Sequence, residues 1–277
     1  MEIPKLILGT STNDLRGDKK TLDKTLVNAI DTALKLGIRA FDSARDYDNE
    51  PLLGNAFKKL GPKYGLKRED LYITTKVGNS QQLTRNMSAQ IDISLQNFQT
   101  DYIDLWMLHW PYPGYFLDNW QEMEDIYKSG KVKAIGLCNC RERHLDQLIF
   151  SGLTVYPTVV QFEYHPFRTV PMLVDLCKDF KIHIQAYSSL CCMLPFVTEN
   201  ELLQTLAKKH GKTIAQIILR WHIQQNVTPI FRSFNPERIK SNMDVFDFEL
   251  TDEEMTQIFS LNTDYKFHPE SMNCPGF

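Results

Sequence analysis

The sequence predicts a single α/β domain with the (β/α)8 architecture of a TIM barrel, extending over residues 1–277. Three observations lead to this prediction. Short apolar runs of strand length alternate along the chain with longer segments of helical periodicity. There are eight such runs, which is the number of strands in this barrel. No Gly-x-Gly-x-x-Gly motif follows the first run, whereas a doubly wound sheet that binds a dinucleotide usually carries one.

The predicted strands are short segments rich in aliphatic, β-branched and aromatic residues, a composition typical of strands. They cover residues 5–10, 38–44, 71–77, 102–110, 132–139, 158–164, 182–189 and 227–233.

The predicted helices are the amphipathic segments between and after these runs. They cover residues 22–36, 84–98, 118–129, 141–150, 171–180, 199–210, 213–225, 236–243 and 251–260. In the first segment, Leu22, Leu26 and Ala29 recur at helical spacing. The last segment opens with Thr251 and has Glu254 three residues later, the pattern of a capping box.

The composition argues against several classes of partner. Lys and Arg total 31 and Asp and Glu total 34, so the net charge of -3 provides no basic excess for nucleic acid or an anionic membrane. No apolar run reaches the roughly 18 residues of a membrane helix, and the N-terminal residues lack a signal-peptide pattern. The six cysteines are scattered without zinc-ligand spacing. We expect reduced thiols, no metal and a cytoplasmic monomer.

Polar residues stand at the ends of the predicted strands, which is where the active sites of such barrels lie. Asp42 lies near the end of the second apolar run and Tyr47 follows that run, Lys76 lies near the end of the third, and His109 lies near the end of the fourth. Each residue alone has an ordinary explanation, such as a solvated lysine or a helix-capping aspartate. Four titratable groups of complementary type at one end of three consecutive strands instead indicate a catalytic site.

These four side chains suit the protonation of an oxygen while a hydride reaches the attached carbon. A tyrosine hydroxyl has a pKa of about 10 and is a poor acid at neutral pH. A neighbouring lysine ammonium lowers that pKa, and an aspartate beside the lysine keeps the lysine charged. A histidine within reach can orient a carbonyl oxygen.

Three segments resemble motifs of the aldo-keto reductase family. Phe-Asp-Ser-Ala-Arg-Asp-Tyr-Asp-Asn-Glu at residues 41–50 resembles the family's D-T-A-x-x-Y-x-N-E motif. Ile-Thr-Thr-Lys at 73–76 resembles its lysine strand, and Leu-His-Trp-Pro at 108–111 ends a segment that resembles its histidine strand. The resemblance covers nearly the whole chain.

This resemblance implies the reduction of aldehydes or ketones to alcohols by hydride transfer from a nicotinamide cofactor. Tyr47 would be the general acid, Lys76 and Asp42 would tune it, and His109 would position the carbonyl of a small substrate. Trp110 and Tyr112, which follow His109, would form part of an aromatic substrate pocket.

The resemblance also implies an NADPH site, with NADH the less favoured cofactor. Asn139 and Gln161 would hold the carboxamide, and Tyr187 would stack on the nicotinamide ring with Ser188 beside it. The 2′-phosphate and adenine would be held by the residues Arg232, Ser233, Arg238 and Asn242. Cys138 and Phe231 depart from the family pattern, which has Ser and Pro at these positions.

Two alternative functions remain. One is a cofactor-binding regulatory subunit with little turnover. The other is a lyase that forms a Schiff base on Lys76, which requires a lysine whose charge is suppressed. Asp42 beside Lys76 would have the opposite effect, so the sequence favours the reductase.

Overall fold

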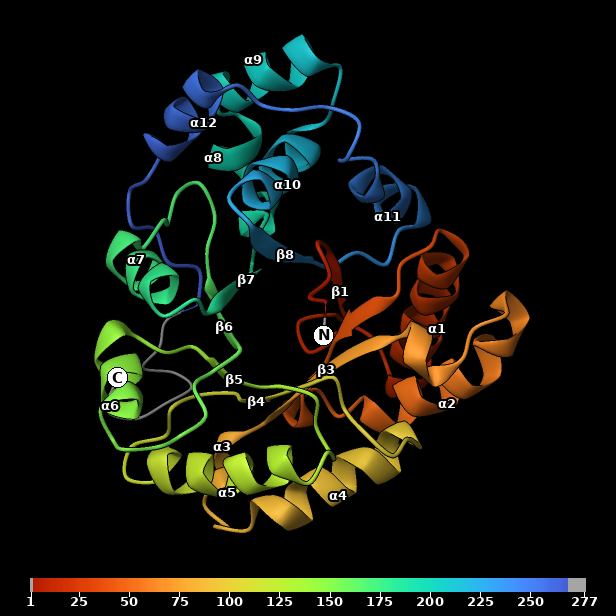
Figure 1. Cartoon of the computed structure of the whole chain (residues 1–277). Coiled ribbons are helices and arrows are strands. Elements are labelled where there is room, and N and C mark those ends of the chain that lie inside the picture. The colour runs from red at the N-terminus through yellow and green to blue at the C-terminus, as the bar shows by residue number, and fades with distance from the viewer. Residues whose placement is uncertain (1, 269–277) are drawn as a thin grey trace.

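The computed structural model, which describes residues 2–268, contains eight parallel strands that close into a barrel in chain order (Figure 1). The strands are β1 (Ile7–Gly9), β2 (Ala40–Asp42), β3 (Tyr72–Val77), β4 (Leu105–Leu108), β5 (Ile135–Cys138), β6 (Val159–Glu163), β7 (His183–Tyr187) and β8 (Val227–Phe231). Strand β1 pairs with both β2 and β8, which closes the sheet. The predicted architecture is confirmed, and each observed strand lies within its predicted segment.

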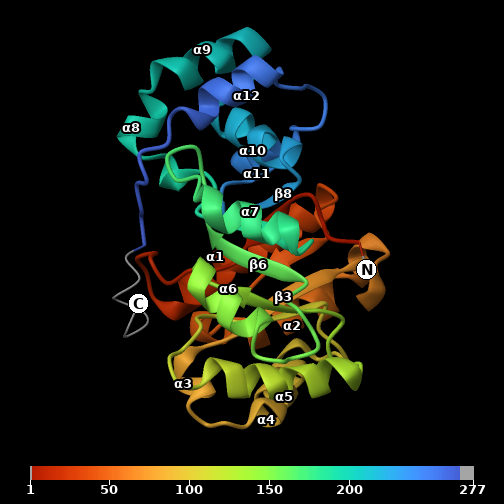
Figure 2. The same ribbon diagram turned by 60° about the vertical axis from the view of Figure 1, so that its left-hand side comes forward.

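Helices surround the barrel (Figure 2). The longer ones are α1 (Lys19–Lys35), α2 (Glu50–Leu60), α4 (Met87–Phe98), α5 (Phe116–Lys128), α6 (Glu142–Ile149), α7 (Pro171–Asp179), α9 (Glu201–His210), α10 (Ile214–Gln224), α11 (Pro236–Met243) and α12 (Asp252–Phe259). Shorter pieces are α3 (Asn79–Gln82), α8 (Pro195–Thr198) and the 3-10 turns η1 (Arg45–Tyr47), η2 (Pro62–Tyr64), η3 (Arg68–Asp70) and η4 (Cys191–Met193). Within residues 2–268, no helix combines the length and apolar character needed to cross a bilayer.

Helix α2 was missed by the sequence-based assignment, as were the short helices α3 and α8. Pro51 and Gly54 both lie in α2 and both lower intrinsic helix propensity. The structure explains the glycine, because a Cβ at Gly54 would lie 2.2 Å from the carbonyl oxygen of Asn97 in α4. Close packing of two helices therefore overrides local propensity here.

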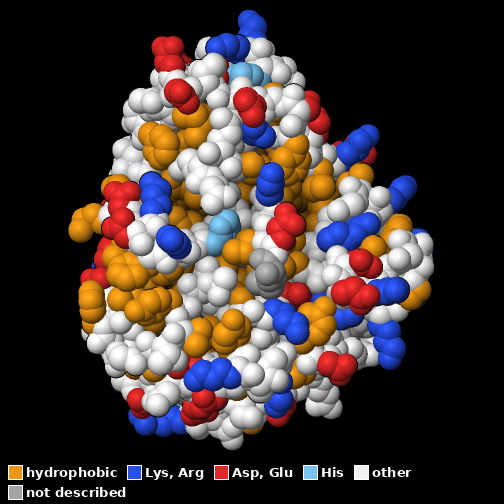
Figure 3. All heavy atoms as spheres, in the orientation of Figure 1, with side chains coloured by type: hydrophobic (Ala, Val, Ile, Leu, Met, Phe, Trp, Pro, Cys, Tyr) orange, Lys and Arg blue, Asp and Glu red, His pale blue; other side chains and the backbone are white. Residues whose placement is uncertain are grey.

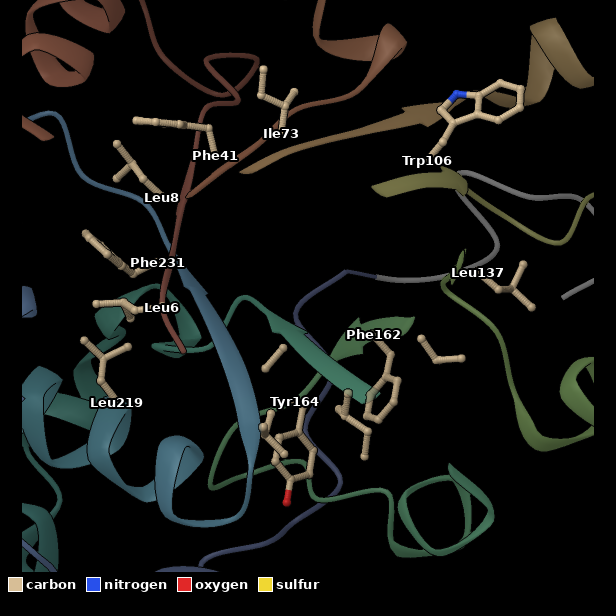
Figure 4. Close-up of a cluster of buried hydrophobic side chains, with 14 of the residues drawn as sticks. Leu6, Leu8, Phe41, Ile73, Trp106, Leu137, Phe162, Tyr164, Leu219 and Phe231 are labelled. Carbon is tan, nitrogen blue, oxygen red and sulfur yellow. The ribbon is translucent and has the colours of Figure 1, made fainter. Parts of the chain in front are cut away.

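The core has two layers, because successive strand residues point alternately toward the helices and into the barrel. Side chains that pack between strands and helices include Leu8, Phe41, Ile73, Trp106 and Phe231 (Figure 4). A separate buried cluster contains their neighbours Ile7, Ala40, Tyr72, Leu105 and Ile230. This second cluster fills the barrel interior.

The same alternation positions polar side chains at the carboxyl end of the barrel. Asp42 lies two residues after Ala40, Lys76 lies four residues after Tyr72, and His109 lies four residues after Leu105. All three therefore share the inward register of the interior cluster. On the face seen in Figure 3, acidic and basic side chains are interspersed among apolar ones.

Candidate active site

Asp42, Tyr47, Lys76 and His109 come together at the carboxyl end of the barrel. The Nζ atom of Lys76 lies 2.6 Å from Asp42 Oδ1 and donates a hydrogen bond of 2.9 Å to the carbonyl oxygen of Ser43. It also lies 5.2 Å from the centroid of the Tyr47 ring. The rings of Tyr47 and His109 meet edge to face, with centroids 5.8 Å apart. The structure thus groups the four side chains that the sequence selected.

The ion pair between Lys76 and Asp42 is buried, and both carboxylate oxygens of Asp42 have partners. Gln161 Nε2 donates to Asp42 Oδ2 at 2.9 Å and lies 3.1 Å from Gln185 Oε1. Burial is the largest single influence on the pKa of Lys76 and would lower it, but the charge and hydrogen bond of Asp42, together with Tyr47 and Cys138, raise the pKa above its ordinary value. Lys76 is therefore a fixed positive charge at neutral pH.

The pKa of Tyr47 moves opposite to the direction expected from its lysine neighbour. Burial raises the pKa of Tyr47 to about 12, and the positive charge of Lys76 only partly opposes this shift. The sequence indicated the effect of Lys76 but not the larger cost of removing a phenolate from water. The hydroxyl consequently keeps its proton through the ordinary pH range and is available as a donor.

His109 is held by a residue that the sequence analysis did not select. Its Nδ1 atom lies 3.0 Å from Asp46 Oδ2, and Asn139 Nδ2 donates to the carbonyl oxygen of His109 at 2.9 Å. Burial lowers the pKa of His109, although Asp46 opposes that shift. The available signal was the position of Asp46, a charged residue directly before Tyr47 in the motif.

The residues predicted to hold a nicotinamide carboxamide also lie at this end of the barrel. Tyr187 donates its hydroxyl to Asn139 Oδ1 at 2.6 Å, and Asn139 Nδ2 lies 3.3 Å from Cys138 Sγ. Asn139 and Ser188 directly follow β5 and β7 with left-handed φ values of 57° and 47°. Non-glycine residues held in this region are strained and cluster at functional sites. Amide donors and acceptors beside an aromatic ring fit a nicotinamide.

The residues predicted to hold a 2′-phosphate follow β8. Arg232 and Ser233 directly follow the strand, and exposed Arg238 lies in the first turn of α11. Arg232 binds both carboxylate oxygens of Asp14, with 2.6 Å between Nη2 and Oδ2. Two arginines and a hydroxyl fit a phosphate group. The sequence contained no direct indication that Asp14 would pair with Arg232. The contact arises because closure of the barrel places the loop after β1 beside the end of β8.

The remaining predicted residues are spread around the barrel mouth and the nearby helix. Asn242 is buried in the last turn of α11. Trp110 is buried directly after His109, and half-buried Tyr112 meets the ring of Tyr115 at 5.8 Å.

The described part of the C-terminal segment is fixed to the end of β6. The carboxylate of Glu163 accepts backbone hydrogen bonds from Phe267 at 2.6 Å and from His268 at 3.0 Å. The ring of His268 lies 5.9 Å from that of Tyr187. The end of the described chain therefore borders the residues predicted to bind the nicotinamide.

Neither a metal cluster nor a disulfide was found in the part of the chain that the structure describes. Across residues 2–268, no group of three or more His, Cys, Asp or Glu side chains is arranged to hold a metal ion. The five cysteines in this range have free thiols. Cys274 lies outside the described residues.

The fold and the site together define a (β/α)8 oxidoreductase. Residues 5–263 match the model of the Aldo/keto reductase family, and the chain belongs to this family. It is accordingly an NAD(P)H-dependent oxidoreductase of the carbonyl-reducing kind.

Several relatives align over most of the chain. The glyoxal reductase of Bacillus subtilis (strain 168) is 39% identical over 241 residues, covering 87% of this chain and 85% of the relative. The methylglyoxal reductase DkgA of Escherichia coli O157:H7 is 36% identical over 251 residues, covering 90% and 88%.

Two solved structures are also similar. MGS-M4, an aldo-keto reductase from a Medee basin deep-sea metagenome library, has a TM-score of 0.89 and 37% identity, covering 98% of this chain and 95% of that chain. The NADPH complex of the aldo-keto reductase AKR2E5 has a TM-score of 0.89 and 26% identity, covering 96% and 86%.

Proposed function

We propose that this enzyme uses NADPH to reduce small aldehydes and ketones to alcohols, with Tyr47 as the general acid. The observation that carries the proposal is the position of Tyr47, whose ring centroid lies 5.2 Å from the Nζ atom of buried Lys76, which Asp42 holds in a 2.6 Å ion pair. The names of the glyoxal and methylglyoxal reductases support small, reactive aldehydes as the first substrates to test.

NADPH, when bound, supplies the hydride that adds to the carbonyl carbon. Tyr47 donates its phenolic proton to the carbonyl oxygen as negative charge develops there. Lys76 stabilises the phenolate that remains, since an opposite charge nearby favours the ionised form. Asp42 holds Lys76 in place through the 2.6 Å ion pair. His109 lies beside Tyr47 and orients the carbonyl oxygen.

The chain offers a separate set of residues for each part of the cofactor. We assign the carboxamide to Asn139 and Gln161, and the face of the nicotinamide ring to Tyr187 with Ser188 beside it. The phosphate and adenine residues are Arg232, Ser233, Arg238 and Asn242. Trp110 and Tyr112 would border the substrate. The solved structure of the aldo-keto reductase AKR2E5 contains NADPH. Because that enzyme has the same fold, its cofactor supports the choice of NADPH for this chain.

The test of the proposed acid is Tyr47→Phe. We expect kcat for methylglyoxal or another small aldehyde to fall by about 10²–10⁴-fold, the usual effect of losing a general acid or base. NADPH affinity, measured by fluorescence quenching, should remain close to that of the parent. Tyr127→Phe, which removes a hydroxyl from the exposed tyrosine of α5, is the matched control.

If the Tyr47→Phe variant kept the kcat of the parent, Tyr47 would not be the general acid. A parent enzyme that binds NADPH but reduces no aldehyde, ketone or sugar would instead favour the cofactor-binding regulatory subunit.

We also propose that the monomer is the active unit, because all the residues assigned to the site come from one chain. Light scattering should give the mass of one chain at the concentrations used for assay. Specific activity should then be independent of protein concentration. Activity that appears only in a larger species would contradict this proposal.

A further inference from the structure

Asp46 and Tyr47 are consecutive residues of the η1 turn, and both approach His109. Asp46 Oδ2 lies 3.0 Å from His109 Nδ1, while the Tyr47 ring meets the His109 ring edge to face. The Asp46 side chain is 40% exposed and that of His109 is 13% exposed. The turn that carries the proposed acid therefore also carries an anionic partner for the neighbouring histidine.

The surroundings of Asp46 leave room for its carboxylate beside His109. A Cβ at Gly78, directly after β3, would lie 2.1 Å from Asp46 Oδ1 and 2.4 Å from Oδ2. Any residue larger than glycine would displace the carboxylate. On the backbone side, Asn13 Nδ2 donates to the carbonyl oxygen of Asp46 at 3.1 Å. Gly78 thus makes space for the carboxylate, and Asn13 fixes the backbone of the residue that carries it.

The contact also determines which nitrogen of His109 carries hydrogen. An ionised carboxylate only accepts hydrogen bonds, so Nδ1 must be the donor to Asp46. In the neutral ring, Nε2 is then an acceptor. A carbonyl oxygen is also only an acceptor, so neutral His109 cannot donate a hydrogen bond to it. The protonated ring can donate from Nε2, and the neutral ring can accept from the hydroxyl of an alcohol.

We propose that Asp46 is a positioning residue that fixes His109 in the Nδ1–H tautomer, so that the ring can donate a hydrogen bond to the carbonyl oxygen only when it is protonated. Protonated His109 donates to the carbonyl oxygen during reduction. This inference rests on the proposed carbonyl–alcohol interconversion and adds to it a residue outside the Tyr47–Lys76–Asp42 unit.

The charges around His109 set the direction of the expected pH effect. Asp46 and Tyr47 of η1, Lys76 of β3 and Asp42 of β2 face it. Burial lowers the pKa of His109 and Lys76 adds to this shift, whereas the charge of Asp46 opposes it. Removing that charge should lower the pKa further, so the protonated ring should appear only at lower pH.

The first experiment is ¹⁵N NMR of the histidine rings in the cofactor-free protein, with His109→Gln used to assign the signals. We expect the Nδ1–H tautomer for His109 in the parent and loss of that preference in Asp46→Ala. An Nε2–H tautomer in the parent would overturn the inference. This measurement needs no turnover, so its outcome is independent of whether the proposed reductase function is correct.

The second experiment compares pH profiles of reduction in the parent, Asp46→Asn and Asp46→Ala. Asn keeps an acceptor oxygen without the charge, so the fall in kcat/KM with rising pH should move about one pH unit lower. Asp46→Ala should lower kcat/KM for reduction by at least about 10-fold, because orientation of the ring is lost as well.

The matched control is Asp48→Asn, which removes the same charge from a 92% exposed side chain two residues away. It should keep the parental profile. A profile that is unchanged in Asp46→Asn would overturn the inference while leaving Tyr47 as the acid. If Asp46→Ala does not fold, the comparison of Asp46→Asn with Asp48→Asn still decides.

Discussion

Arg232 binds Asp14 through both of its terminal nitrogens, which is the same fork geometry that a guanidinium uses for phosphate. Arg232 Nη1 also donates to the carbonyl oxygen of Ser11 at 2.9 Å. The carboxylate of Asp14 thus occupies the arginine that we assign to the 2′-phosphate. A phosphate that binds Arg232 must compete with this internal anion.

Competition at Arg232 leads to a prediction for cofactor choice. We expect the parent to prefer NADPH over NADH by roughly 10²-fold, because NADH lacks the 2′-phosphate that Arg232 and Arg238 would contact. Arg238→Ala should weaken NADPH binding alone. Asp14→Asn should tighten NADPH by up to about 10-fold and leave NADH unchanged, since the competing charge is gone. Fluorescence-quenching titrations with both cofactors measure all three effects.

Asp175→Asn is the control for a general electrostatic effect, because it removes a negative charge from an exposed side chain of α7. It should leave the affinities for both cofactors unchanged. Equal affinity of the parent for NADH and NADPH would contradict the assignment of the phosphate residues. Equal tightening of both cofactors by Asp14→Asn would contradict the competition.

At the scale of elements, Glu254 ties α12 to α9. It forms the predicted capping box with Thr251, whose backbone N–H donates to Glu254 Oε2 at 2.8 Å. From α9, Lys209 Nζ lies 2.7 Å and His210 Nε2 lies 3.0 Å from Glu254 Oε1. The sequence indicated the cap, whereas the contacts to α9 emerge only from the packing of the two helices.

This arrangement predicts a pH-dependent contribution to stability. Burial would raise the pKa of Glu254, but its hydrogen bonds with Lys209, Thr251 and His210 lower it from 4.5 to about 2. Its stabilising contribution should therefore be complete above pH 4.5 and should be lost as the pH falls toward 2. Glu254→Gln should lower the free energy of unfolding at pH 7 by about 1–3 kcal/mol.

Urea unfolding of the parent and Glu254→Gln at several pH values measures this contribution. The difference between the two proteins should narrow as the pH falls from 4.5 toward 2. Glu253→Gln, at the exposed neighbouring position, should behave like the parent. A difference that is independent of pH would mean that the charge of Glu254 is not what stabilises the contact.

At the scale of the whole molecule, the fold places most of the thiols inside. Of the cysteines within residues 2–268, Cys192 is exposed and the other four are buried. Burial raises the pKa of Cys138, Cys177 and Cys191 to about 12, which suppresses the reactive thiolate. Cys274 lies outside the described residues.

Thiol titration tests this distribution. The denatured protein should give six free thiols, in agreement with the sequence. In the native protein, Cys192 should react much faster than the buried thiols, and Cys192→Ser should remove one fast-reacting equivalent. Fewer than six thiols after denaturation would indicate a disulfide, and an unchanged fast phase in Cys192→Ser would contradict the exposure of that side chain.

The sequence by itself was enough to predict the barrel, the strand positions and the four side chains at the mouth. These features depend on local patterns, because strand alternation puts Asp42, Lys76 and His109 on the inward register, and the motif around Tyr47 is contiguous. The cap formed by Thr251 and Glu254 is local in the same way. Helix α2 was not predicted because Gly54 lowers the local helix propensity. The glycine is needed for close packing against α4, and that contact cannot be inferred from neighbouring residues in the sequence.

Only the tertiary structure decided how the partners of these side chains are arranged. Gln161 reaches Asp42 across 119 residues and Arg232 reaches Asp14 across 218, so both contacts depend on closure of the barrel. Asp46 meets His109 because β2 and β4 flank β3 at the same end of the sheet. The pKa of Tyr47 rises because the surrounding fold removes water from the hydroxyl. Desolvation and contacts between distant strands arise only when the barrel closes. The size of their effects therefore cannot be read from the sequence alone.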